Sequence, residues 1–332
     1  LVISLVLIQV GKNFLIPLIL SLLAWGLLNG LSNYIMKLHV GPVSTPRWIA
    51  TLLSVMLFGL ILLGVYQSLA SQAADLTAAG PVYEANFTRL LNDLVAWLGI
   101  EELPSTDSFI ENINIGSVLS LVGSSIGSIF SSIILIIIYT GFLFAEQKAI
   151  PSKQSALHPD AESKGKVNLL FTEIATQVQR YILMKTAVSL LTGVLSYIVL
   201  KLVGVDFAAV WALLIFLLNY IPHIGSVLGV VFPALLTLVQ FDTLTPFLIT
   251  TLSLGTIQFV VGNVIEPAYM GKSLNLSPLM IILSLTFWGM LWGIPGMFLS
   301  VPIMVVATII CSRFENLRWI AVVLSADGGK CS

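Results

Sequence analysis

The residues best able to bind a polar molecule lie where this sequence is most apolar. The segment LLNYIPHIGSVLGVVFP, residues 217–233, places an amide, an imidazole, a hydroxyl, a proline and a glycine in an otherwise apolar run. They are Asn219, Pro222, His223, Gly225 and Ser226. Proline removes a backbone donor and glycine permits a tight turn, so the segment predicts an interrupted helix. Backbone freed inside an apolar segment persists only where it is buried in protein or lines a wet cavity, so we expect these residues to contact a small solute.

A second segment, WGMLWGIPGMFLSVP at residues 288–302, repeats this pattern. It also has an Ile-Pro pair with glycine close behind, and it adds Trp288, Pro295 and Gly296 as candidates for solute contact, although Trp288 could equally serve packing. Roughly fifteen apolar residues precede each break, and as α-helix they span about 22 Å, less than the roughly 30 Å of a hydrocarbon core. Paired breaks are typical of a transporter's binding site. Three interpretations stay open, namely re-entrant hairpins of half-helices, continuous helices kinked at proline, or separate short spans.

An acidic residue lies between the two breaks, in GNVIEPAYMGKSLNLSP at residues 262–278. Glu266 follows an apolar helix almost directly, and Asn263 precedes it. An acid in a spanning segment is costly and usually faces a cavity or a partner. Glu266 could bind a solute hydroxyl, carry a coupling proton, hold a cation, or cap a helix end beside Lys272. Asn263 suits a hydroxylated solute and also an interhelical hydrogen bond.

The composition sets the class of protein. Hydrophobic residues make up 57% of the 332 residues and charged residues 9%, with a net charge of −1, and the mean hydropathy is +1.01. These values indicate a membrane protein whose environment is the lipid bilayer. The basic residues form no stripe that could bind nucleic acid. Cys311 and Cys331 lack metal-ligand spacing, and no catalytic motif is present, so we expect no metal, no cofactor and no enzyme.

Eight apolar segments predict an all-α polytopic integral membrane protein, with residues 1–332 forming a single membrane transporter domain. The segments are 1–10, 14–36, 48–70, 117–145, 183–203, 207–240, 245–264 and 277–311. Two of them, 207–240 and 277–311, contain the proline breaks. Because the first residue is Leu1 rather than Met, we expect the first segment to be incomplete.

Charge predicts the orientation. Residues 71–116 form an acidic insert with helical spacing of apolar residues, whereas 146–182 are amphipathic and rich in lysine. Lys and Arg mark the cytoplasmic side of short loops. The insert is therefore expected outside, and 146–182 and both termini are expected in the cytoplasm.

The segments LLNYIPHIGSVLGVVFPAL, GNVIEPAYMGKSLNLSPLMIILSLTFWGMLWGIPGMFLSVP and VVLSADG resemble the autoinducer-2 exporter (AI-2E) family of bacterial membrane proteins. The resemblance covers nearly the whole chain, including GPVSTPRWIA at residues 41–50. It implies a similar set of membrane segments in each subunit and a homo-oligomer, a pentamer, in the bacterial inner membrane. Members of the family are associated with export of the quorum-sensing signal autoinducer-2, and others with sodium or lithium/proton antiport.

The residues distinguish among three functions. Export of a neutral solute needs polar groups at the breaks, whereas an antiporter needs a titratable acid in the pathway. No Asp or Glu lies deep inside an apolar segment, which favours a neutral solute such as autoinducer-2 over a cation. A scaffold or regulator without transport is a further alternative, but it would not need costly breaks at membrane depth.

Overall fold

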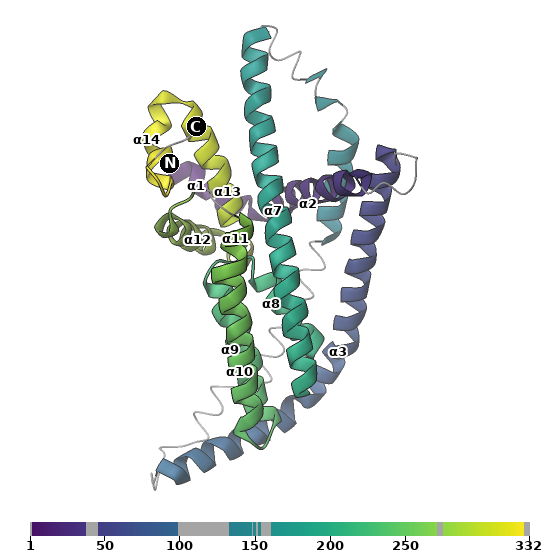
Figure 1. The fold of residues 1–332 in the computed structure, drawn as a ribbon, viewed down its shortest axis with the longest axis vertical. Helices are drawn as coiled ribbons and strands as arrows, with labels where there is room; N and C mark the ends of the chain where they lie inside the picture. Colours follow the sequence, from purple (N-terminus) through teal and green to yellow (C-terminus); the bar gives the residue numbers. More distant parts are fainter. Residues whose placement is uncertain are drawn as a thin grey trace. The chain divides into compact units, whose positions relative to one another are not determined.

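The protein is built from α-helices in a computed structural model that describes residues 2–37, 46–98, 133–147, 149–150, 152–153, 161–270 and 275–328 (Figure 1). The helices are α1 (Val2–Val10), α2 (Lys12–Lys37), α3 (Arg47–Leu98), α7 (Ala161–Val203), α8 (Ala208–Leu218), α9 (Ile224–Gln240), α10 (Leu244–Val260), α11 (Glu266–Met270), α12 (Pro278–Trp292), α13 (Ile294–Arg313) and α14 (Arg318–Leu324). The only extended pairing among the described residues is an isolated bridge between Leu276 and Ser325. The all-α prediction is confirmed.

Among the residues that the structure describes, five helical segments are long and apolar enough to cross a membrane. They are Lys12–Lys37, Arg47–Gly64, Val167–Val203, Leu244–Tyr269 and Ile294–Arg313. Shorter apolar helices are Ile133–Glu146, Ala208–Leu218, Ile224–Gln240 and Pro278–Trp292. The lengths and compositions of these helices define a polytopic membrane protein. The helix Ile133–Glu146 covers the second half of the predicted segment 117–145. Outside the described residues lie 117–132 of that segment and 99–116 of the acidic insert.

Two helices extend beyond the predicted apolar segments. Helix α3 has 52 residues and continues past residue 70 into the acidic insert, while α7 has 43 residues and begins inside the basic segment 146–182. Apolar run length marks where lipid contact ends, but helical hydrogen bonding continues into polar sequence. Residues 71–98 of the acidic insert and residues 161–182 of the basic segment are therefore helical.

The chain divides into two compact units. Unit 1 comprises Leu1–Leu60, Ser131–Ala187 and Glu266–Ser332. Its buried core consists of Tyr181, Ile182, Leu276, Val301, Met304 and Val305. The backbone nitrogen of Ser277 donates to Leu324 O at 2.9 Å, which ties the start of α12 to the end of α14.

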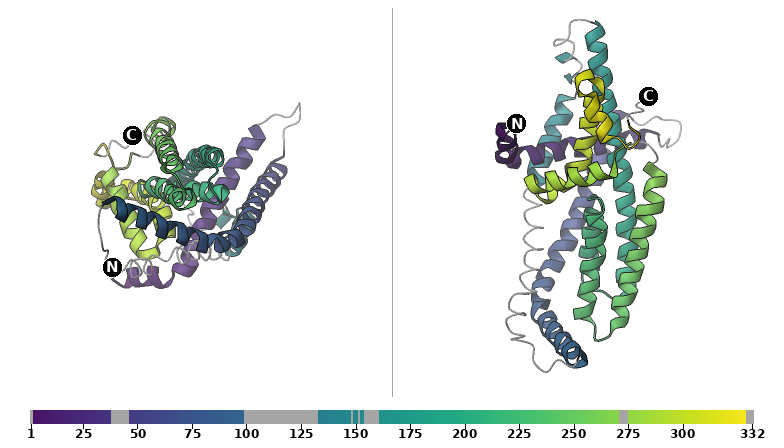
Figure 2. Two further views of the ribbon diagram at one scale, coloured as in Figure 1. Left: turned by 90° about the horizontal axis from the view of Figure 1, so that it is seen from below. Right: turned by 90° about the vertical axis from the view of Figure 1, so that its left-hand side faces the viewer.

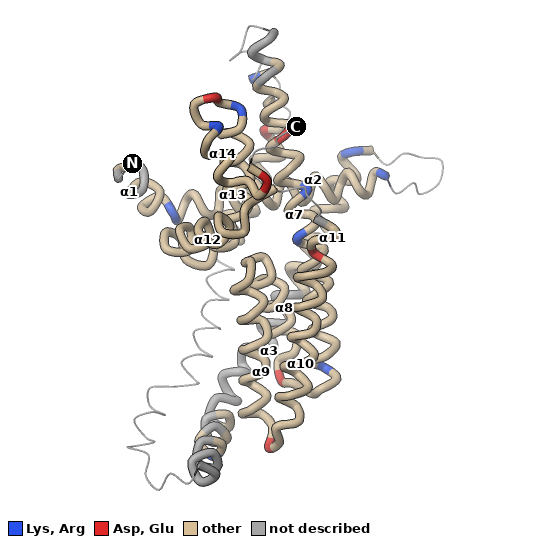
Figure 3. The backbone as a smooth tube through the Cα atoms, turned by 60° about the vertical axis from the view of Figure 1, so that its left-hand side comes forward, with Lys and Arg blue, Asp and Glu red and all other residues tan. Residues whose placement is uncertain are grey.

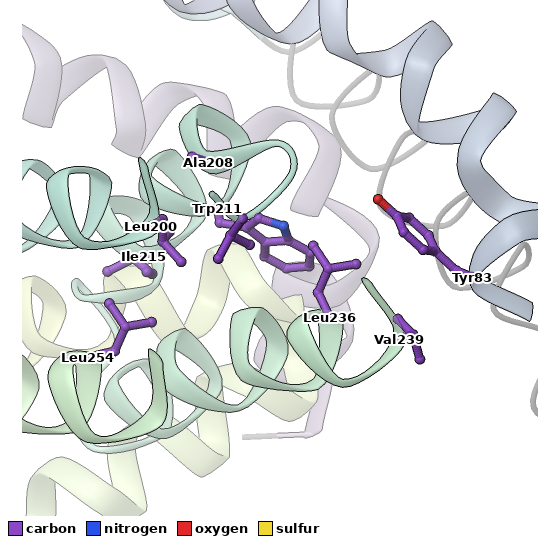
Figure 4. Packing of buried hydrophobic residues seen from close by; sticks show 9 residues of the cluster. Tyr83, Leu200, Ala208, Trp211, Ile215, Leu236, Val239 and Leu254 are labelled. Carbon is purple, nitrogen blue, oxygen red and sulfur yellow. The ribbon is translucent and has the colours of Figure 1, made fainter. Parts of the chain in front are cut away.

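Unit 2 comprises Ile61–Phe130 and Val188–Ile265. Helices α9 and α10 run side by side within it (Figures 1 and 2). Its core includes Leu200 of α7, Trp211 and Ile215 of α8, Leu236 of α9 and Leu254 of α10. Figure 4 shows these side chains converging from the four helices. We call α8, α9, α10 and the 188–203 part of α7 the core bundle.

Contacts across each break exclude one of the open interpretations. A β-carbon added at Gly229 of α9 would lie 3.4 Å from Ile215 Cγ1 of α8. The Ser284 hydroxyl of α12 donates to Ser300 O of α13 at 3.1 Å. In continuous helices these pairs would lie roughly 20 Å or more apart at 1.5 Å per residue. Both segments are therefore helical hairpins, and the kinked-helix alternative is wrong. Helix α13, with 20 residues, is longer than the expected half-helix.

Candidate functional site

The first break is a strained turn between α8 and α9. The backbone nitrogen of Ile224 donates to Pro222 O at 2.7 Å, which closes a three-residue turn centred on His223. His223 has φ 61° and ψ −55°, a rare conformation for a residue other than glycine, and its side chain is exposed. Strained backbone of this kind is concentrated at functional sites, so the break is a candidate site on structural grounds as well.

Gly225 is what allows this turn to close. A β-carbon at Gly225 would lie 1.7 Å from Leu218 O and 3.3 Å from Asn219 N, distances that no side chain tolerates. The glycine next to the Ile-Pro pair is therefore required by the close approach of the two helix ends, as the sequence pattern indicated.

Asn219 is the polar side chain held inside the first break. It is 6% exposed, and its Nδ2 donates at 3.0 Å to Ser189 Oγ, which is fully buried on α7. Ser226, in the first turn of α9, is half-buried, and so is Pro222. The break thus combines one buried amide–hydroxyl pair with a partly accessible hydroxyl, and the hydrogen-bonding capacity of these groups suits neutral oxygen-bearing molecules.

The second break is a sharper reversal between α12 and α13. Gly293 has φ 66° and ψ −143°, a region that is essentially restricted to glycine. Pro295 lies in the first turn of α13, where its missing N–H would have no intrahelical acceptor in any case. A β-carbon at Gly296 would lie 1.9 Å from Trp288 O, so this glycine has the same function as Gly225 in the first break.

Trp288 belongs to an aromatic cluster at the end of α12. Its ring centroid lies 4.7 Å from that of Trp292 and the Phe287 centroid lies 5.3 Å away, with the Phe287 ring nearly perpendicular. Trp292 is buried and donates Nε1 to Ile8 O at 3.1 Å. The packing role that the sequence left open for Trp288 is therefore present, and a contact with solute stays a prediction.

Glu266 forms a buried ion pair. Its Oε1 accepts a hydrogen bond from Lys185 Nζ at 2.5 Å, and the two side chains are 23% and 4% exposed, respectively. Lys272, the partner considered from the sequence, lies outside the described residues. Lys185 was not among the predicted site residues, although a lysine at the foot of an apolar helix is itself a signal, because such a charge requires a partner.

The segment before Glu266 is a π-helix, Val261–Ile265. Single π-helical turns are uncommon and are frequent at functional sites, but no sequence pattern predicted this one. Asn263 lies within it, is exposed, and donates its Nδ2 to Phe259 O at 3.0 Å. The interhelical hydrogen bond considered for Asn263 is therefore not formed by this donor.

The ten predicted site residues fall in two groups. Unit 2 contains Asn219, Pro222, His223, Gly225, Ser226 and Asn263, and unit 1 contains Glu266, Trp288, Pro295 and Gly296. The structure brings the first five together at one turn, and it places Trp288, Pro295 and Gly296 at another. No group of three potential metal ligands occurs in the part of the chain that the structure describes.

A cavity of about 380 Å³ lies at the end of α8 opposite to the first break. Its lining comprises Tyr197, Lys201, Gly204, Val205, Asp206, Phe207, Ala208 and Ala209. None of these is a predicted site residue. At the same end Tyr83 of α3 donates its hydroxyl to Asp206 at 2.7 Å, and Asn86 donates to Val239 O at 2.8 Å. Burial and this hydrogen bond raise the pKa of Tyr83, so its hydroxyl remains a donor at neutral pH.

These features define a polytopic helical membrane protein with two interrupted-helix hairpins, the construction found in transporters. A family model described as "AI-2E family transporter" matches residues 1–316, and the chain belongs to this family.

Three relatives are similar along most of their length. The chain is 32% identical to "AI-2 transport protein TqsA" of Escherichia coli (strain K12), over 96% of this chain and 91% of that protein. It is 30% identical to "Putative transport protein YhhT" of the same strain, over 96% of this chain and 89% of that protein. It is 31% identical to a "Putative transport protein" of Haemophilus influenzae, over 84% of this chain and 82% of that protein.

Proposed function

We propose that this protein exports a small uncharged polar solute, and that the solute is autoinducer-2. The name of the Escherichia coli relative, AI-2 transport protein, supports this solute. Proposed solute contacts are Asn219, Pro222, His223, Gly225, Ser226 and Asn263 in unit 2, and Glu266, Trp288, Pro295 and Gly296 in unit 1. Each hairpin turn exposes irregular backbone, which supplies the hydrogen-bonding groups that a hydroxylated solute needs.

One observation carries the choice of an uncharged solute. The five long apolar helical segments contain two carboxylates, and both are ion-paired, Glu266 with Lys185 and Glu173 with Arg313. A carboxylate neutralised by a lysine or arginine has no net charge to offer a transported cation. The helices α8, α9, α10 and α12 contain no charged residue at all (Figure 3). The direct test is flux of labelled autoinducer-2, with sodium as the competing cargo, in vesicles containing the purified protein.

A sodium or lithium/proton antiporter is the second candidate, and the Lys185–Glu266 pair favours it. A cation or proton could compete with Lys185 for the Glu266 carboxylate. If the pair couples transport to protons, Glu266→Gln should abolish the dependence of flux on an imposed pH gradient while solute still binds. If Glu266 only positions solute, the variant should keep any gradient dependence and change the apparent affinity. We expect the second result, measured as efflux rate against solute concentration with and without a pH step.

We place the protein in the bacterial inner membrane with both termini in the cytoplasm. In this orientation the end of unit 2 that contains residues 204–207 and 240–243 is extracytoplasmic, because Tyr83 and Asn86 of the acidic insert contact it. The polar insert and these interhelical turns therefore share one end. A homo-oligomer, a pentamer, is proposed from the family resemblance.

Orientation predicts the labelling of introduced cysteines. In a variant with Cys311 and Cys331 replaced by serine, a cysteine at Asp93 should react with an impermeant thiol reagent applied to intact cells. A cysteine at Lys164 should react only after the membrane is permeabilised. Reaction of both sites from the same side would contradict the proposed orientation.

A further inference from the structure

The core bundle contains an unusual concentration of unpaired polar atoms. Five buried side-chain atoms of the described residues make no hydrogen bond, and all five belong to α7, α8 or α10 in unit 2. They are Ser196 Oγ, Trp211 Nε1, Thr250 Oγ1, Thr251 Oγ1 and Gln258 Nε2. Unpaired buried polar groups are rare and costly, so each needs a reason. Because all five lie in one bundle, we expect them to be unpaired for the same reason.

The hydroxyl groups of Ser196 and Thr250 differ from those of Thr192 and Thr308, which also lie within helices. Thr192 donates to Val188 O at 2.9 Å, and Thr308 donates to Met304 O at 2.9 Å, the usual bond to the carbonyl four residues back. Ser196 and Thr250 are 1% and 0% exposed and do not make this bond. Their hydroxyls therefore remain available to another partner inside the bundle.

Three of the unpaired groups, on Ser196, Thr250 and Gln258, lie on buried faces of their helices. Thr250, Leu254 and Gln258 follow one another at four-residue spacing on α10, and Leu254 packs in the buried cluster with Ile215 and Leu200 (Figure 4). Ser196 lies one turn before Leu200 on α7. The polar face of α10 therefore lies against the interior from which α7 and α8 also contribute side chains.

Gln258 is the unpaired group nearest to the first break. It is 7% exposed, and its Nε2 lies 3.1 Å from where a β-carbon of Gly229 would be. This contact is tighter than most β-carbons make, so the lack of a side chain at Gly229 is what lets the Gln258 amide lie against α9. Ile215 borders the same place, one helical turn from the Asn219–Ser189 pair. The polar groups thus follow the bundle from the first break towards its other end, over roughly 12 Å between Thr250 and Gln258.

We propose that the interior of the core bundle binds hydroxyl oxygens, through Gln258, Thr250 and Ser196 next to the Asn219–Ser189 pair. A hydroxyl accepts from the Gln258 amide and both accepts from and donates to the two side-chain hydroxyls. The lack of charged residues in α8, α9 and α10 restricts the ligand to a neutral one. Its hydroxyls come either from a small polyol-like solute or from internal water. Only the identity of the solute rests on the proposed function; the site itself does not.

Thr250→Val tests the site, with Thr237→Val as the matched control. Both threonines are fully buried in unit 2, but the Thr237 hydroxyl is already paired with Ala234 O at 2.6 Å. Removing an unpaired hydroxyl should leave the thermal unfolding midpoint of the purified protein unchanged or higher, whereas removing a paired one should lower it. We expect autoinducer-2 efflux from vesicles to fall at least tenfold in Thr250→Val and Gln258→Leu, and to remain at the parent rate per folded protein in Thr237→Val.

Radiolytic hydroxyl labelling distinguishes the two sources of the hydroxyl. Labelling of buried Leu254 requires water beside it, so we expect modification in the unliganded parent protein. Protection by added autoinducer-2 identifies the solute as the ligand, and unchanged labelling identifies water. No labelling of Leu254, together with parent efflux in Thr250→Val, would overturn the proposal. Vesicles in which the parent moves no autoinducer-2 would refute the proposed solute, while the labelling of Leu254 would still decide on the site.

Discussion

Gly225→Ala is expected to unfold the first hairpin, with a loss of at least about 3 kcal/mol in the free energy of unfolding. The added methyl group would lie 1.7 Å from Leu218 O, and that oxygen is backbone that cannot move without opening the turn. Gly296→Ala should act in the same way on the second hairpin, because its β-carbon would lie 1.9 Å from Trp288 O. A fall of roughly 6 °C or more in the thermal unfolding midpoint of purified protein would show the effect.

Gly255→Ala is the matched control for both glycine variants. Gly255 lies inside α10, and a β-carbon there meets nothing within 4 Å. Alanine favours helix over glycine by about 0.5–1 kcal/mol, so this variant should be neutral or slightly more stable. Equal unfolding midpoints for Gly225→Ala and Gly255→Ala would contradict the tight-turn geometry.

Lys185→Ala is expected to cost about 3 kcal/mol, because it leaves the carboxylate of Glu266 largely buried without its partner. The double variant Lys185→Met with Glu266→Gln removes both charges and keeps similar volumes, so it should recover most of this loss. The measurement is a double-mutant cycle on the thermal unfolding of the purified protein.

The exposed Arg89–Asp242 pair provides the comparison for this cycle. Its side chains are 57% and 77% exposed, so Arg89→Ala should cost less than about 1 kcal/mol. If Lys185→Ala were as mild as Arg89→Ala, the Lys185–Glu266 pair would not be a stabilising element of unit 1.

The sequence predicted the helical class and the positions of both breaks, because apolar run length and proline placement are local properties. It left hairpin and kink undecided, since an Ile-Pro pair followed by glycine suits either. The choice depends on packing between distant residues, such as Gly229 against Ile215 and Ser284 against Ser300 O. Such contacts have no local sequence signal.

The candidate site was predictable only in part for the same reason. Glu266 was identified from its position in an apolar segment, but its partner Lys185 is 81 residues away. The π-helix before Glu266 and the unpaired amide of Gln258 depend on tertiary packing and were not foreseen. Polarity alone identified Asn219, whereas its pairing with Ser189 required the helices to be placed.

Flux through the purified protein in vesicles tests the central claim of uncharged-solute export most directly. Vesicles are loaded with labelled autoinducer-2 and radioactive sodium together, and the loss of each label is followed in the same preparation. Empty vesicles and vesicles containing the Gly225→Ala variant serve as controls. We predict protein-dependent loss of autoinducer-2 while sodium leaks at the rate of empty vesicles. Protein-dependent loss of sodium without loss of autoinducer-2 would contradict the account and identify a cation antiporter instead.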